Sequence, residues 1–112
     1  MKPKGYITSP QELDAIFNAL ANQTRREMLL QLQGGATSVT EIAASFEISQ
    51  PAVSKHLRVL EKAGLITRDV DRQKRPAALH PANLAVAVAW LKQFEAFWLG
   101  SFDQLDKLLE DI

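Results

Sequence analysis

The sequence contains no cysteine, so neither a disulfide framework nor thiolate chemistry is available to the fold. It also has no excess of charge, because 13 Lys and Arg residues balance 13 Asp and Glu residues. No apolar run is long enough to predict a membrane span, and the first residues lack the apolar core of a signal peptide. We therefore expect a cytoplasmic chain that folds as one domain over residues 1–112.

The zero net charge conceals an uneven distribution along the chain. Residues 49–75 contain seven Lys and Arg against three Asp and Glu, a net charge of +4, whereas residues 1–48 carry −1 and residues 76–112 carry −3. Positive charge concentrated in one segment is typical of a nucleic-acid-binding surface. A solvated helix and hairpin without any partner would show a similar pattern, so the motifs within the segment carry more weight.

The segment after residue 48 has the start and stop signals of a helix. Ser49 can cap the N-terminus, Pro51 suits the first turn, and Gly64 suits a left-handed C-terminal cap. The helical spacing predicts a buried stripe of Val53, Leu57 and Leu60. The opposite face carries side chains that can hydrogen-bond to base edges or phosphates in the major groove of DNA: Gln50, Ser54, Lys55 and Arg58.

Residues 38–63 have the spacing of a helix-turn-helix. Ser38 and Glu41 match a capping box at the start of the first helix, and the chain restarts as a helix at Ser49. In this motif the second helix enters the major groove. Glu47 departs from the glycine that often occupies the turn, and a non-glycine residue forced to positive φ costs roughly 1 kcal/mol.

Residues 65–80 predict a β-hairpin, or wing, behind the second helix. Residues 65–70 are rich in β-branched side chains, and residues 77–80 can return as a weaker strand. Cations at the tip of such a hairpin can reach phosphates or the adjacent minor groove. The basic residues of the predicted wing are Arg68, Arg72, Lys74 and Arg75.

Together these motifs resemble the ArsR/SmtB family of bacterial winged-helix repressors. Residues 13–26, LDAIFNALANQTRR, are similar to the segment with which the family starts its second helix. Residues 54–66, SKHLRVLEKAGLI, are close to the family's run S-x-H-L-x-x-L-x-x-A-G-L-(I/V). The resemblance covers nearly the whole chain. It implies a mainly α winged helix-turn-helix with about five helices and a small β-hairpin, acting as a symmetric dimer that represses transcription.

Particular DNA contacts follow from the residue types. Gln50 can pair bidentately with adenine, while Lys55 and Arg58 can contact guanine or phosphate. Arg25, at the start of the second helix, can bind phosphate with help from the helix dipole, but it can equally serve as an intramolecular ion-pair or capping partner. His56 matches the family segment, where a packed, hydrogen-bonded histidine is more usual than a ligand. The predicted DNA-binding residues are Thr24, Arg25, Ser49, Gln50, Ser54, Lys55, His56, Arg58, Arg68, Arg72, Lys74 and Arg75.

The two ends of the chain carry more apolar surface than one small monomer can bury. A helix over 9–21 has one apolar face, and the pattern over 82–111 is apolar on more than one side. We therefore predict a C2 homodimer that reads a palindromic operator with recognition helices one DNA turn apart. The predicted interface residues, which ordinary core packing within one chain would also explain, are Leu13, Ile16, Phe17, Leu20, Leu91, Phe94, Phe97, Trp98, Phe102 and Leu105.

The resemblance also supplies two metal sites for comparison. The family's Cys-x-Cys site lies where this chain has Ser38-Val39-Thr40, and its Asp and His site lies on the last helix, where this chain has carboxylates but no histidine. We therefore predict no metal site and no cofactor. A metal-independent repressor is the expected function, while regulation of its own operon and a small-molecule effector are left open.

Two other classes of function are alternatives to repression. Catalysis is not expected, because Ser54 and His56 lie two apart on a helix and no acidic residue is placed to orient His56. The stronger alternative is a winged-helix dimer that binds protein without specific DNA binding. A protein-docking helix would expose an apolar anchor where this chain has a polar and basic face.

Overall fold

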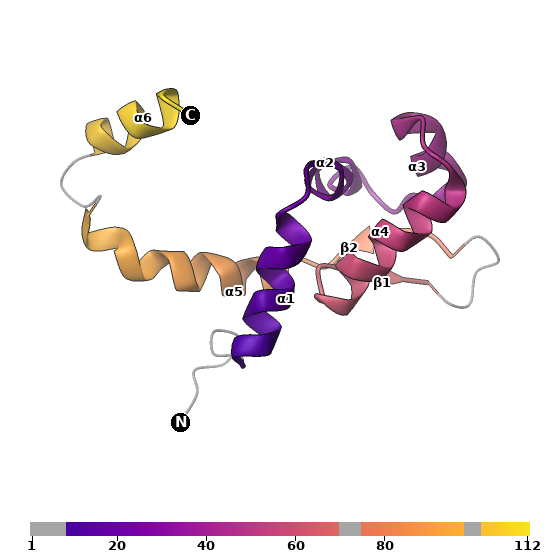
Figure 1. Cartoon of the computed structure of the whole chain (residues 1–112), viewed down its shortest axis with the longest axis horizontal. Coiled ribbons are helices and arrows are strands. Elements are labelled where there is room, and N and C mark those ends of the chain that lie inside the picture. The colour runs from indigo at the N-terminus through magenta and orange to yellow at the C-terminus, as the bar shows by residue number, and fades with distance from the viewer. Residues whose placement is uncertain (1–8, 70–74, 98–101) are drawn as a thin grey trace.

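The computed structural model describes residues 9–69, 75–97 and 102–112, with the side chains of 102–105 excepted. Its order of elements agrees with a mainly helical winged helix-turn-helix (Figure 1). The elements are α1 (Pro10–Leu20), α2 (Gln23–Leu32), α3 (Val39–Phe46), α4 (Gln50–Lys62), β1 (Ile66–Arg68), β2 (Ala77–Leu79), α5 (Ala82–Leu91), the 3-10 helix η1 (Lys92–Phe97) and α6 (Phe102–Glu110). None of the described helices is long and apolar enough to cross a membrane.

The helix starts lie where the capping residues predict them. Ser9, Ser38 and Ser49 each accept a hydrogen bond from the backbone N–H three residues on, at 3.1–3.2 Å. Glu41 completes the capping box, because its carboxylate accepts from the Ser38 N–H at 3.2 Å. These bonds satisfy amides of the first turn that have no partner within the helix, so the boundaries are set locally.

The turn between α3 and α4 depends on one residue in the left-handed conformation. Glu47 has φ 56° and ψ 39°, and its N–H donates to the Ala43 carbonyl. The next amide, that of Ile48, also donates to Ala43, at 3.3 Å. The predicted turn is thus confirmed, including the strain of a non-glycine residue at positive φ.

One core joins α1–α4, the hairpin and the first half of α5. The predicted inner stripe of α4 is confirmed, because Val53, Leu57 and Leu60 are each 0% exposed. Ile16 on α1 is 1% exposed and packs in the same core. Its predicted place in a dimer interface is therefore wrong, because its own chain already covers it.

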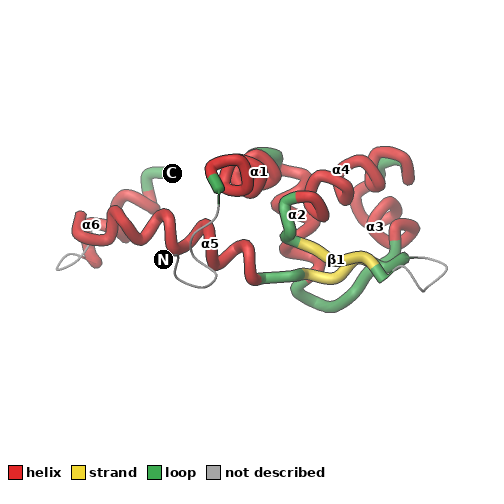
Figure 2. The backbone as a smooth tube through the Cα atoms, turned by 90° about the horizontal axis from the view of Figure 1, so that it is seen from below, coloured by secondary structure: helices red, strands yellow, loops and turns green. Residues whose placement is uncertain are grey.

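The wing is a two-stranded antiparallel hairpin with Ile66 opposite Leu79 and Arg68 opposite Ala77 (Figure 2). Its strands are shorter than the segments that the sequence predicted. Thr37, before α3, forms an isolated bridge with Ala77, through N–H to carbonyl bonds of 2.9 Å in both directions. This bridge ties the base of the wing to the start of the helix-turn-helix. Arg72 and Lys74 lie outside the described residues.

The predicted apolar helix over 82–111 is divided. Regular α-helix ends at Leu91 and tightens into η1, and α6 follows only at Phe102. Gln93 helps to end α5, because its side-chain amide donates to the Trp90 carbonyl at 3.0 Å. The division thus begins well before Gly100, which lies outside the described residues, as do Ser101 and Trp98. Both views show α6 away from the α1–α4 body (Figures 1 and 2).

We predict that Gly64→Ala lowers the free energy of unfolding by about 1–3 kcal/mol, because Gly64 ends α4 with φ +75°. A Cβ there would lie 2.3 Å from Nδ2 of Asn83, which donates to the Ala63 carbonyl at 2.8 Å. Urea denaturation measures the loss. Gly34→Ala is the matched control, because its nearest contact would be an ordinary 3.4 Å. Equal stability of the two variants would contradict this account of the turn.

Candidate nucleic-acid interface

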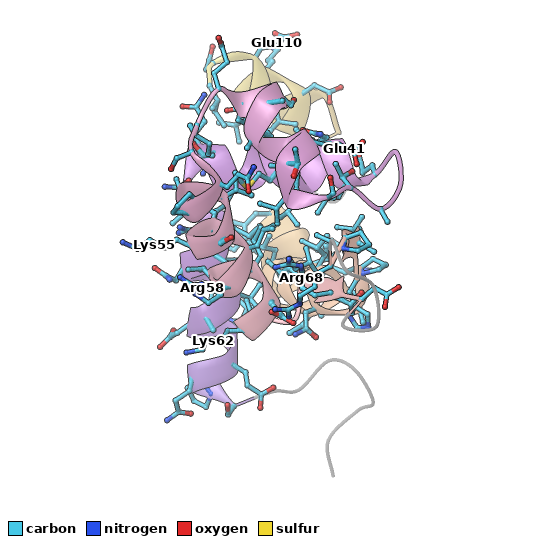
Figure 3. The ribbon with its side chains drawn as sticks, turned by 90° about the vertical axis from the view of Figure 1, so that its right-hand side faces the viewer. Glu41, Lys55, Arg58, Lys62, Arg68 and Glu110 are labelled. Atoms are coloured by element: carbon cyan, nitrogen blue, oxygen red, sulfur yellow. The ribbon has the colours of Figure 1, made fainter. Side chains whose placement is uncertain are left out.

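The outer face of α4 is polar and basic. Gln50, Lys55 and Arg58 are exposed, and Ser54 is half-buried. Lys55, Arg58 and Lys62 project from the same side of the helix (Figure 3). None of the exposed large apolar side chains in the described part of the chain lies on α4. This face therefore offers hydrogen-bonding groups and positive charge, which suit base edges and phosphates.

Ser49 is engaged at the start of α4. Its hydroxyl oxygen accepts from the Ala52 N–H at 3.2 Å, while its own O–H stays able to donate. A DNA contact by Ser49 stays a prediction, and it would have to be compatible with the cap.

Arg25 binds within the protein rather than projecting away from it. Its Nε donates to the Ala19 carbonyl at 2.9 Å, and its Nη2 donates to the Asn18 carbonyl at 3.0 Å. These carbonyls lie in the last turn of α1, where the usual amide four residues on is missing, although the Asn18 carbonyl also accepts from the Ala21 N–H. Arg26 acts similarly, through a 2.8 Å bond from Nη1 to the Leu20 carbonyl. The capping alternative for Arg25 is thus observed, and its contact with DNA, like that of half-buried Thr24, stays a prediction.

His56 is a packed, hydrogen-bonded histidine, as is usual for this position. Its Nδ1 lies 3.4 Å from Nη1 of Arg25. A guanidinium can only donate, so Nδ1 accepts and the proton of the neutral ring is on Nε2. Partial burial lowers the pKa of His56, and the positive charges of Arg25 and Lys55 lower it further. The neutral ring is therefore favoured.

Arg68 has a structural role that the sequence did not reveal. Its Nε donates to the Arg75 carbonyl at 2.9 Å, which closes the base of the wing. Partial burial lowers the pKa of the Arg68 guanidinium, as does the charge of Arg75, whereas Glu61 raises it. Arg75 itself is exposed and has φ 43°. The side chain free to point outward is thus that of Arg75, while Arg68 supports the backbone.

A second surface, apolar rather than basic, lies on α5 and η1. Trp90 joins α5 to α1 through an edge-on contact with Phe17, at 5.7 Å between ring centroids, and it packs on Phe94 at 5.2 Å. Leu91 and Phe94 remain 43% and 42% exposed, and Phe97 remains 77% exposed. Sequence reasoning did not place Trp90 in this cluster, although its spacing of four from Phe94 would have indicated it.

Some of the other predicted interface residues pack against the core, and others lie outside the described part of the chain. Leu13, Phe17 and Leu20 are half-buried and pack against the core. The side chains of Phe102 and Leu105, and the whole of Trp98, lie outside the described part of the chain. Among described residues, no three His, Asp or Glu side chains are grouped so that they could hold a metal ion.

Comparison with known proteins finds transcriptional regulators, both as a family model and as single relatives. The model for bacterial regulatory proteins of the arsR family matches residues 22–68, from α2 through β1. The HTH-type transcriptional regulator Rv2034 of Mycobacterium tuberculosis is 36% identical over 92 residues, which are 82% of this chain and 86% of that protein. The transcriptional repressor SdpR of Bacillus subtilis is 32% identical over 82 residues, which are 73% of this chain and 91% of SdpR.

Comparison of the fold with solved structures finds a regulator of the same family. The crystal structure of an ArsR family transcriptional regulator superimposes with a TM-score of 0.74 and 32% identity, over 83% of this chain and 96% of that chain. Sequence and structure thus agree over most of the chain, and the family model includes the whole of α4. The chain belongs to the ArsR family of bacterial winged helix-turn-helix transcriptional regulators.

Proposed function

We propose that this protein is a sequence-specific transcriptional repressor that binds an inverted-repeat operator as a homodimer and needs no metal. The observation that carries the proposal is the outer face of α4, where Gln50, Lys55 and Arg58 are exposed over a fully buried apolar stripe. Such a helix can enter the major groove without burying a large apolar side chain, and its one acidic residue, Glu61, lies in the last turn, where its charge acts on Arg68.

The distribution of apolar surface argues against α4 as a protein-docking helix. Protein interfaces are centred on aromatic and other large anchors. In the described residues these anchors are exposed on α5, η1 and α6, with Leu30 on α2 as the exception. The alternative of a winged-helix module that only binds protein would need its anchor on α4 or the wing.

The apolar surface on α5 and η1 supports pairing with a second copy. Soluble monomers rarely expose a continuous patch with several aromatic residues. Trp90, Phe94 and Phe97 form such a series, and Trp90 contacts α1, the other helix that we expect in the interface. A C2 dimer presents two copies of α4, which together read more base pairs than either does alone.

Metal independence is supported by the ligands that the chain lacks. There is no cysteine, and the only histidines are His56 and His80. His56 contacts Arg25, and His80 contacts the Gly64 carbonyl at 3.2 Å from Nδ1. Neither histidine belongs to a group of metal-binding side chains in the described part of the chain.

The proposal is tested by titrating the protein against DNA from upstream of its own gene, and against a random library from which bound duplexes are selected. We expect a selected inverted repeat, steep salt dependence, and binding that neither EDTA nor zinc changes. The absence of selective binding at low salt would support the protein-docking alternative. Release by zinc would show that metal independence is wrong.

We predict that Gln50→Ala costs about 1–3 kcal/mol on the selected duplex and much less on random DNA, because a base contact carries sequence preference. Fluorescence anisotropy on both duplexes measures the difference. Gln33→Ala is the matched control, because Gln33 is exposed at the end of α2, outside α4 and the proposed dimer interface. Equal losses on both duplexes would rule out base reading by Gln50.

For Arg75→Ala we predict weaker binding to both duplexes and a salt slope reduced by about one, because a phosphate contact does not distinguish sequences. Affinities at several salt concentrations give the slope. An unchanged slope would place the exposed Arg75 side chain away from DNA in the complex.

Phe97→Asp should weaken the dimer by at least about 2 kcal/mol, roughly thirtyfold in Kd, because it puts a charge into the proposed aromatic interface. Phe97 is 77% exposed, so the fold of one chain loses little. Sedimentation across a concentration series measures dissociation. Leu30→Asp is the matched control, since Leu30 is 64% exposed but lies on α2. Equal weakening by both variants would mean that η1 is not the interface.

A further inference from the structure

The Arg25 side chain joins three helices. Its backbone lies in the first turn of α2, where its N–H donates to the Asn22 cap at 3.0 Å. Its guanidinium reaches back to the Asn18 and Ala19 carbonyls at the end of α1, at 3.0 and 2.9 Å, and forward to Nδ1 of His56 on α4, at 3.4 Å. One planar group thus connects the helix that we place in the dimer interface with the helix that we place on DNA.

The contact with α4 requires a neutral histidine. Once protonated, His56 has two N–H donors and no acceptor, so it can no longer receive the Arg25 N–H. The charged groups that act on His56 are Arg25 from α2 and Lys55 from α4, and both are cations. Protonation would therefore replace a hydrogen bond with repulsion, while the carbonyls of α1 keep their hold on Arg25.

We infer that Arg25 is a positioning residue for DNA binding, which couples α1 to the recognition helix through neutral His56, and that acidification releases this coupling and weakens binding. The inference rests on the proposed function. Two recognition helices must match the spacing of successive major grooves, and that spacing depends on how each α4 is held relative to the dimer axis. The Arg25 contact joins the end of α1 to the middle of α4, so its loss would change how α4 is held relative to the dimer axis.

The direction of the pH effect separates positioning from direct contact. A histidine that touched phosphate would take up a proton on binding, so DNA affinity would rise as the pH falls. Coupling through neutral His56 predicts that affinity falls. Similarly, Arg25 as a phosphate contact needs only its charge, whereas Arg25 as a coupling residue needs the planar fork that lysine lacks.

His80 supplies an internal reference. Its Nδ1 lies 3.2 Å from the Gly64 carbonyl, and a carbonyl can only accept, so His80 Nδ1 donates. The structure thus assigns opposite tautomers to the two histidines of the chain, with the proton on Nε2 in His56 and on Nδ1 in His80. A single spectrum of the free protein can distinguish them.

The first test is a ¹⁵N NMR titration of the histidine rings in the free protein, with His80→Gln used for assignment. We expect unprotonated Nδ1 in neutral His56, a His56 pKa below the ordinary value of about 6.5, and a higher pKa with a mixed tautomer in Arg25→Gln. The linked folding stability would be present above about pH 6.5 and lost as the pH falls through the folded-state pKa. A protonated Nδ1, or a His56 tautomer unaffected by Arg25→Gln, would overturn the inference.

The second test measures affinity for the selected duplex from about pH 8 to about pH 5.5, across the ordinary histidine pKa. We expect the affinity of the wild type to fall about tenfold over this range, which is the effect of losing one charge-assisted hydrogen bond. His56→Gln should show no such loss, because its amide oxygen still accepts from Arg25 without titrating. Affinity that rises on acidification, or that falls equally in His56→Gln, would overturn the inference.

Arg25→Lys completes the design at about pH 8. Arg25→Lys and Arg25→Gln should each bind about tenfold more weakly than the wild type, and both should keep the wild-type salt slope. Recovery of wild-type affinity by lysine would make Arg25 a phosphate contact and overturn the positioning role. If the wild type binds no DNA, the proposed function fails, while the NMR titration still decides whether Arg25 sets the state of His56.

Discussion

The burial of one face of α4 is the constraint on which the rest of the structure depends. Val53, Leu57 and Leu60 have no exposed surface, so the helix cannot rotate without exposing apolar area or burying charge. This fixes which residues face outward, and none of them is a large apolar side chain. The strained turn at Glu47 and the cap at Ser49 set where the helix begins, and Gly64 sets where it ends. The outward-facing residues of α4 are thus positioned by core packing.

The basic and apolar surfaces are connected through α1. On one side Phe17 contacts Trp90 of α5, and on the other the last carbonyls of α1 bind Arg25. Because α1 also contributes Ile16 to the core, a change at the apolar surface cannot shift α1 without disturbing packing that reaches α4. This is a physical route by which pairing of two chains can influence the orientation of both recognition helices.

Local chemistry explains what could be predicted from the sequence. Capping serines, helical spacing and the glycine after α4 act within a few residues, and the structure confirms each. What escaped prediction depends on contacts across the fold. The hydrogen bond from Arg68 to the Arg75 carbonyl was not predicted, while a DNA contact by Arg68 stays a prediction. The Arg25 contact spans 31 residues, and no local pattern indicates that His56 is its partner. One local feature also escaped prediction, because α5 ends at Leu91, where the side-chain amide of Gln93 donates to the Trp90 carbonyl.

The roles of the charged residues also show why net charge is a poor guide to function here. Arg25, Arg26 and Arg68 bind backbone carbonyls, so their hydrogen bonds support the fold and not a partner. The exposed cations of α4, which are Lys55, Arg58 and Lys62, project from one side of the helix (Figure 3). A few fixed charges bind a polyanion better than a larger number spread over the surface, because less conformational entropy is lost on binding. A chain with zero net charge can therefore carry a DNA-binding surface when its exposed cations are concentrated on one face, even though Glu61 also lies exposed on α4.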